Sequence, residues 1–166
     1  LITQGIEVCI NERNSLYANG IRYFAAKLDI SRGHPQRAIA LLRKNYPAVQ
    51  RDGYAPQIAQ FDALLATAYS ETKQPQMARE SALAAIAHGI YNHYAESIST
   101  AYRILYQVAN QQGEVAGNFI ARKYKGKNIA ILQDKSTYGK GLADQTKAAL
   151  NKAGVKEKMY EAYTAG

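Results

Sequence analysis

The sequence is poor in the residues that build disulfide frameworks, zinc sites and membrane spans. It has one cysteine, Cys9, so it offers no intramolecular disulfide and no cysteine framework for zinc. The longest central stretch without Asp, Glu, Lys or Arg, from Ser81 to Ala95, is too short to cross a bilayer, and we expect no membrane insertion. With 4 Pro and 12 Gly, collagen-like and low-complexity classes are excluded as well.

What remains is a globular composition, with 47% hydrophobic and 20% charged residues. A chain of 166 residues has room for one ordinary domain or two small ones. It begins at Leu1 instead of methionine, and no basic flank leads into an apolar run. We therefore expect that a signal peptide has been removed or that the chain is a fragment.

The basic residues change in type partway along the chain. Residues 1–112 contain 8 Arg and 3 Lys, whereas residues 113–166 contain 1 Arg and 9 Lys. The net charge is +3 in the first segment and +5 in the second. A change of this kind predicts two domains with different histories, 1–112 and 113–166.

The first segment contains a repeat of helical hairpins. Residues 33–38 match residues 73–78 at an offset of 40, and a further shift of 38 places residues 111–113 over the same polar turn. Apolar residues recur at spacings of three and four between these turns, and Pro35 and Pro75 each fit the first turn of a helix. The pattern predicts helices over residues 15–30, 35–46, 55–72, 75–88 and 94–111.

This pattern resembles the tetratricopeptide-type repeat over residues 14–112, in the looser form found in bacterial sensor proteins. The resemblance implies a concave surface that binds a ligand or protein, or that mediates self-association, and it does not imply catalysis.

After residue 112 the pattern changes to helix, strand, helix and strand. We expect a helix over 115–124, a buried strand over 128–134, a loop over 136–141, a helix over 142–153 and a strand over 155–163. Two parallel strands leave both sheet edges unpaired, so this segment needs a neighbour. The helix over 114–124 could serve both architectures, as it would in a chimera joined at a shared helix.

Residues 111–113, 127–143 and 160–166 resemble the periplasmic leucine/isoleucine/valine-binding proteins. That family has two doubly wound lobes that close on an amino acid. The resemblance implies that the second segment is a strand–helix–strand fragment of such a lobe, located in the periplasm. It also implies that Tyr138 is a ligand-binding residue bordering the cleft, whereas the family's other ligand contacts have no counterpart here.

The remaining chemical candidates are weak. Gly139-Lys140-Gly141 could cradle an anion or simply form a tight turn, and Asp134 could be functional or a strand-end turn residue. His88 and His93 are poorly spaced for a metal site. We predict no catalytic residue, no metal ligand and no cofactor.

The densest basic cluster, residues 122–127, could touch nucleic acid. Lysines near a helix C-terminus are, however, favoured by the helix dipole in any case. We therefore predict no nucleic-acid partner.

The sequence as a whole predicts a mostly helical fold with a small α/β part. The first functional hypothesis is a non-enzymatic binding or sensory scaffold that takes a protein partner or self-associates. The alternative is a fragment of a solute-binding protein for branched-chain or other aliphatic amino acids, linked to ABC transport. A further alternative is an engineered chimera with no evolved function.

Overall fold

The computed structural model describes residues 2–11, 14–91 and 94–164, which form seven helices and two strands. In chain order these are α1 (Ile2–Asn11), α2 (Ser15–Ser31), α3 (Pro35–Asp52), α4 (Ala55–Glu71), α5 (Pro75–Ile90), α6 (Ala95–Lys123), β1 (Ala130–Gln133), α7 (Thr137–Lys152) and β2 (Met159–Ala162). The fold is therefore mostly helical with a small parallel sheet, as the sequence predicted. The chain divides into two compact units, unit 1 (residues 1–104) and unit 2 (residues 105–166).

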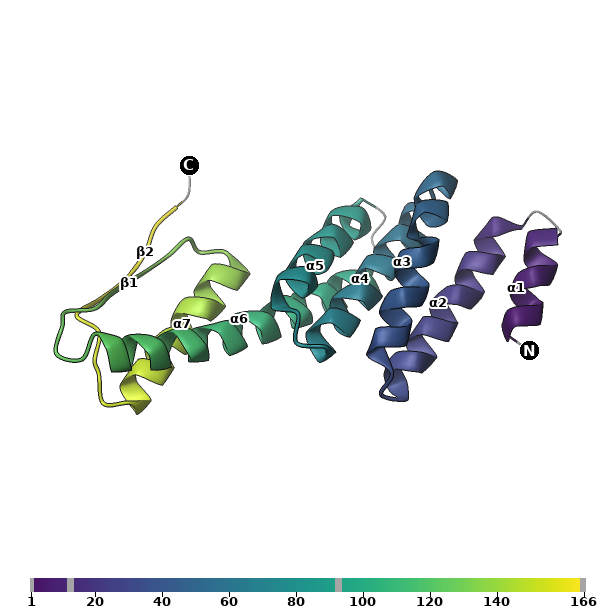
Figure 1. Ribbon diagram of the computed structural model, residues 1–166. Helices are drawn as coiled ribbons and strands as arrows, with labels where there is room; N and C mark the ends of the chain where they lie inside the picture. The colour runs from purple at the N-terminus through teal and green to yellow at the C-terminus, as the bar shows by residue number, and fades with distance from the viewer. Residues whose placement is uncertain (1, 12–13, 92–93, 165–166) are drawn as a thin grey trace. The chain divides into compact units, whose positions relative to one another are not determined.

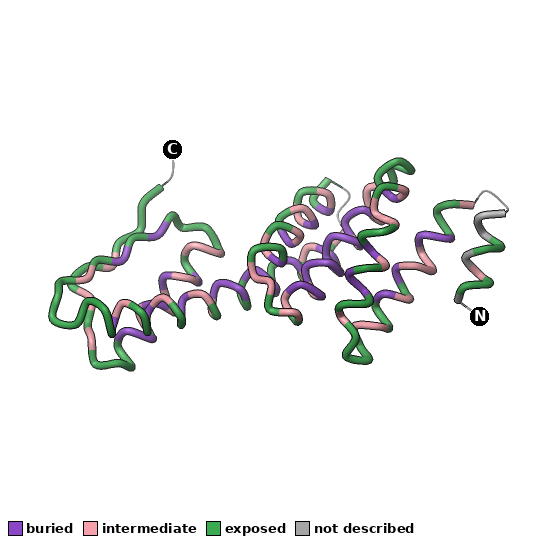
Figure 2. The backbone as a smooth tube through the Cα atoms, in the orientation of Figure 1, coloured by how far each residue is buried: buried purple, intermediate pink, exposed green. Residues whose placement is uncertain are grey.

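Unit 1 is built from consecutive antiparallel helices (Figure 1). Helix α4 packs against α2, α3 and α5, and it is accordingly the helix with most of its surface buried (Figure 2). Its buried residues include the large side chains Ile58, Phe61, Leu64, Leu65 and Tyr69. These are the apolar positions whose spacing of three and four predicted the helix.

The hairpin turns after α2 and α4 have the same backbone geometry. The amide of His34 donates to the carbonyl of Asp29 at 2.8 Å, and the amide of Gln74 donates to the carbonyl of Tyr69 at 2.9 Å. The residue before each donor has a left-handed backbone, with φ of 77° at position 33 and 56° at position 73. In each turn the left-handed residue also donates its amide to a carbonyl of the helix, Gly33 to Ile30 and Lys73 to Ser70. Two hydrogen bonds of this kind satisfy the last carbonyls of a helix. The 40-residue sequence offset thus corresponds to a repeated turn.

The third turn expected at residues 111–113 was wrong, because α6 runs without interruption from Ala95 to Lys123. The helices expected over 94–111 and 115–124 are one helix. Its first residues belong to unit 1 and its second half belongs to unit 2. The change in Arg and Lys usage therefore falls inside a helix, and the assignment of domains at residue 112 stays a prediction.

The reason α6 does not turn at Gly113 is its packing on α7. A β-carbon at Gly113 would lie 2.6 Å from the β-carbon of Gln145, and one at Gly117 would lie 2.5 Å from the carbonyl oxygen of Thr146. Both distances are shorter than van der Waals contact, so only glycine allows the two backbones to approach this closely. The glycine that looked like a turn residue serves helix packing instead.

In unit 2 the two strands pair in parallel, with Ala130 opposite Met159 and Gln133 opposite Ala162. Ile131 packs with Ala121 of α6 and with Ala143 and Leu150 of α7 in a small core. Residues 130 and 132 face outward, so one face of the sheet is covered and the other is exposed.

The expected loop over 136–141 was also wrong. Ser136 caps α7 by accepting a hydrogen bond from the amide of Gly139 at 2.9 Å, so residues 137–141 are already helical. Helix α3 likewise continues past its expected end at Tyr46, through Pro47, to a left-handed Gly53 with φ of 69°. Helix α1 had not been predicted.

We expect Gly117→Ala to lower the free energy of unfolding of unit 2 by about 1–2 kcal/mol, because overpacking α6 against α7 outweighs the gain in helix propensity. The control is Gly20→Ala in α2, where no heavy atom lies within 4 Å of the added methyl group. That change should raise stability by about 0.5–1 kcal/mol. Urea unfolding followed by circular dichroism and amide exchange measures both, and a stabilised Gly117→Ala variant would contradict the packing argument.

Candidate functional site

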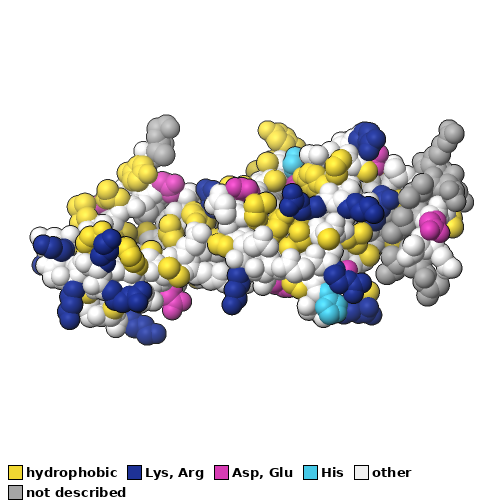
Figure 3. Space-filling view, in the orientation of Figure 1, with side chains coloured by type: hydrophobic (Ala, Val, Ile, Leu, Met, Phe, Trp, Pro, Cys, Tyr) yellow, Lys and Arg dark blue, Asp and Glu magenta, His cyan; other side chains and the backbone are white. Residues whose placement is uncertain are grey.

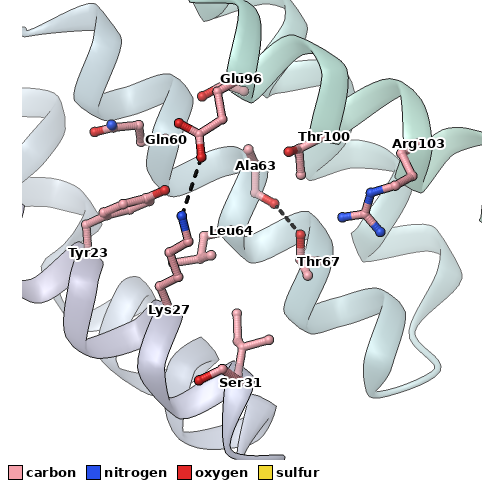
Figure 4. Close-up of a pocket in the computed structure, with 12 residues that line it drawn as sticks. Tyr23, Lys27, Ser31, Gln60, Ala63, Leu64, Thr67, Glu96, Thr100 and Arg103 are labelled. Carbon is pink, nitrogen blue, oxygen red and sulfur yellow. Dashed lines mark hydrogen bonds and ion pairs between the residues drawn. The ribbon is translucent and has the colours of Figure 1, made fainter.

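A groove of about 240 Å³ lies between α2, α4 and α6 within unit 1 (Figure 4). Its polar lining comes from three helices and consists of Tyr23, Lys27, Ser31, Gln60, Thr67, Glu96, Ser97, Thr100 and Arg103. Ile30, Ala63 and Leu64 form its apolar part. The groove brings together side chains that are up to 80 positions apart in the sequence.

Opposite charges meet at one end of the groove. The ammonium of Lys27 lies 3.4 Å from a carboxylate oxygen of Glu96, and it lies 5.7 Å from the centre of the Tyr23 ring. Burial raises the pKa of the Tyr23 hydroxyl. The pKa of Lys27 is raised, first by its electrostatic interaction with Tyr23 and further by Glu96, so the ammonium remains charged at neutral pH.

A second cation lines the groove on the side of α6. The Arg103 side chain extends from α6 towards Thr67 of α4, as Figure 4 shows. Within the part of the chain that the structure describes, its guanidinium has no carboxylate within ion-pair distance, whereas Lys27 already pairs with Glu96. Two cations and one carboxylate favour a ligand group of negative charge, with the hydroxyls of Thr67 and Thr100 nearby. The lining contains no cysteine and no histidine.

A buried acidic residue links three helices of unit 1. The carboxylate of Asp62 in α4, with 3% of its surface exposed, accepts a hydrogen bond from the Tyr46 hydroxyl of α3 at 2.5 Å. Its other oxygen lies 2.7 Å from Nδ1 of His88 in α5. Burial raises the pKa of Asp62, while the two hydrogen bonds act in the opposite direction. Burial and the bond to Asp62 also raise the pKa of Tyr46 above its usual range.

The sequence interpretation missed this cluster and considered His88 only as a poorly spaced metal ligand. The available signal was Asp62 itself, the one charged residue between Ala55 and Tyr69, with apolar residues on either side of it. A carboxylate among buried apolar positions must find hydrogen-bond partners, which points to polar groups on the neighbouring helices.

Tyr138, the predicted ligand-binding residue, lies half-buried in the first turn of α7. Its hydroxyl donates to the side-chain oxygen of Gln112 in α6. Tyr138 and the motif at residues 111–113 are therefore in contact within unit 2. Its role in binding a ligand stays a prediction.

The other candidates in unit 2 have local structural roles. The exposed carboxylate of Asp134 accepts hydrogen bonds from the amide and hydroxyl of Ser136, and these bonds lower its pKa. Lys140, at the centre of the Gly-Lys-Gly motif, pairs with Asp144 one helical turn later at 2.7 Å. A β-carbon at Gly139 would overlap the Asp134 carboxylate, so a larger residue there would displace that side chain.

Two other residues singled out in the sequence, His93 and the side chain of Cys9, lie outside the described residues. Across the described part of the chain, no group of three or more His, Cys, Asp or Glu side chains could hold a metal ion. None of the helices found there is both long and apolar enough to span a bilayer.

Part of the chain is clearly similar to amino-acid-binding proteins. Over 57 residues, 34% of this chain, it is 56% identical to an amino acid binding protein of Pseudomonas aeruginosa. Over 74 residues it is 42% identical to the leucine-, isoleucine-, valine-, threonine-, and alanine-binding protein of the same bacterium. Over 57 residues it is 49% identical to Leu/Ile/Val-binding protein homolog 1 of Brucella abortus. The predicted resemblance is confirmed to this extent.

These alignments cover a small part of each relative. The chain spans only 15% to 20% of the length of these curated relatives. No family model matches the chain, and no solved structure matches it.

We expect Asp62→Asn to become more stable relative to the wild type as the pH rises. The ordinary pKa of an aspartate is 3.8, and burial of Asp62 raises its value in the folded state. Below pH 3.8 the carboxyl is protonated in both states; above the raised pKa the folded state alone carries the penalty of a buried charge. The stability that Asp62 contributes is therefore largest at low pH and is lost as the pH rises through the raised pKa.

Thermal melts from pH 3.5 to 7 measure this difference, with Glu71→Gln at the exposed end of α4 as the control. Asp62→Ala should lower stability by about 2–4 kcal/mol at pH 3.5, because Tyr46 and His88 both lose their partner, and by less as the pH rises. A difference between wild type and Asp62→Asn that does not change with pH would contradict the assignment.

Proposed function

We propose that the chain takes part in recognising an aliphatic amino acid, with residues 113–166 forming part of a periplasmic amino-acid-binding lobe linked to ABC transport. The observation that carries this proposal is the 56% identity over 57 residues to an amino acid binding protein. The relatives are all named as binding proteins, which supports a non-enzymatic role.

The geometry of unit 2 is compatible with this role. In parallel α/β sheets, ligands bind outside the carboxyl ends of the strands. Tyr138 follows the carboxyl end of β1 in the first turn of α7, and its hydroxyl meets Gln112 of α6. The amino terminus of α7 would favour the carboxylate of an amino acid, and the phenol would border its side chain.

Calorimetric titration with leucine, isoleucine and valine tests the proposal. We expect heat with the L-amino acids and none with D-leucine, and Tyr138→Phe should weaken binding about fivefold through the loss of one hydrogen-bonding hydroxyl. The control, Tyr163→Phe, changes an exposed tyrosine near the end of β2 and should leave the affinity unchanged. Absence of heat with all three amino acids would overturn the proposal.

A second function is supported by the groove of unit 1. We propose that residues 1–112 act as a scaffold of tetratricopeptide-like hairpins that binds a protein segment in the groove between α2, α4 and α6. The repeated hairpin turn supports the repeat assignment, and the excess of cations over carboxylates in the groove supports an acidic peptide. A junction of two natural segments within α6 would account for the change from arginine to lysine.

Selection from a displayed peptide library tests this second function. We expect the selected peptides to carry acidic residues and to lose at least about tenfold in affinity for Arg103→Glu, because like charges then meet in the groove. The control is Arg43→Glu, an exposed residue of α3 that does not line the groove. Equal loss in the two variants would exclude the groove as the binding surface.

A further inference from the structure

Two lysine-rich segments that are separate in the sequence meet at one edge of unit 2. Because β1 and β2 are parallel, the residues that precede them lie at the same edge, and the amide of Lys158 donates to the carbonyl of Ile129 at 2.8 Å. Helices α6 and α7 run in the same direction, because Gly113 faces residues 142–146 of α7 and Gly117 faces residues 146–150. The C-termini of both helices therefore lie at this edge as well. The basic edge consists of Arg122, Lys123, Lys125, Lys127, Lys152, Lys156 and Lys158, all of them exposed.

The positive charge of the basic edge is not neutralised within unit 2. The acidic residue in this region, Glu157, is largely covered and pairs with Lys147 at 2.8 Å. Within the described part of the chain, none of the seven basic side chains has a carboxylate within ion-pair distance. The C-termini of α6 and α7 each carry about half a negative charge, so together they offset about one of the seven positive charges. Figure 3 shows Lys and Arg side chains gathered around this end of unit 2.

Two exposed aromatic side chains lie beside these cations, Phe119 in α6 and Tyr124 just after it. Phe119 is 48% exposed and Tyr124 is 43% exposed, and their rings pack edge to face. The Lys123 ammonium lies over both rings, 5.3 Å and 5.9 Å from their centres. Stacking of nucleic-acid bases requires a free ring face, and the Lys123 ammonium lies over one face of each ring. Aromatic bodies flanked by lysine are instead the combination favoured at the interface of a lipid bilayer.

We propose that the basic edge docks onto the surface of a bilayer rich in anionic phospholipids. Clusters of four to eight Lys and Arg side chains bind such surfaces through the negative potential of the headgroups. The contact is peripheral: the lysines pair with headgroup phosphates, while Phe119 and Tyr124 enter the interfacial region. The proposal does not depend on amino-acid binding or on the groove of unit 1.

Sedimentation with lipid vesicles tests the docking. We expect the chain to bind vesicles that contain 30% phosphatidylglycerol, not to bind vesicles of phosphatidylcholine alone, and to be released in 1 M salt, where charges act over only about 3 Å. Replacing Lys125, Lys127, Lys156 and Lys158 by glutamine should reduce partitioning about 100-fold or more. The control replaces four exposed basic residues of unit 1 by glutamine, namely Arg32, Lys44, Arg51 and Lys73, and should have a small effect.

A fluorescence reporter locates the contact. The chain contains no tryptophan, so Phe119→Trp introduces a single tryptophan at the basic edge, which can be excited selectively over the tyrosines. Its emission should shift to shorter wavelength on anionic vesicles as the ring leaves water. Phe24→Trp, at a 67% exposed position of unit 1, should not shift.

Three results would overturn the proposal. The first is no binding to anionic vesicles. The second is an equal loss of binding in the two sets of glutamine variants, which would show that only net charge matters. The third is binding of duplex DNA by the basic edge without binding of vesicles, which would assign the edge to a different polyanion. Circular dichroism verifies that each variant is folded.

Discussion

The continuity of α6 is the constraint on which both units depend. Its first turns carry Glu96 and Arg103 to the groove of unit 1, and its second half presents Gly113 and Gly117 to α7. Glycine within a helix costs about 1 kcal/mol relative to alanine, so two of them one turn apart weaken α6 considered alone. The close approach of α7 offsets that loss by burying Ala149 and Leu150 against α6 and the sheet.

The two units treat charge in different ways. Unit 1 pairs some of its charges internally, with Asp62 buried between Tyr46 and His88 and with Lys27 beside Glu96. Unit 2 collects most of its lysines at the edge where both strands begin and both helices end, with few carboxylates to match them. Buried polar groups fix how helices pack, whereas exposed, unpaired cations are available to an external partner.

The similarity to amino-acid-binding proteins concerns a short segment, whereas the architecture concerns the whole chain. The chain matches these relatives with high identity over a short segment, but it spans only 15% to 20% of their length. A two-stranded parallel sheet covered on one face is smaller than a stable sheet usually is. Unit 2 gains stability from α6, which also belongs to unit 1.

The sequence alone determined the hairpins at the 40-residue offset and the strand–helix–strand order. Those features depend on neighbours in the chain, such as the prolines that begin α3 and α5 and the apolar run of β1. It could not determine the role of Gly113, because glycine permits both a tight turn and a close helix contact. It also could not place His88 beside Asp62, or Lys158 beside Ile129. Only the tertiary structure decided these, because residues 26 and 29 positions apart meet through the packing of whole helices and strands.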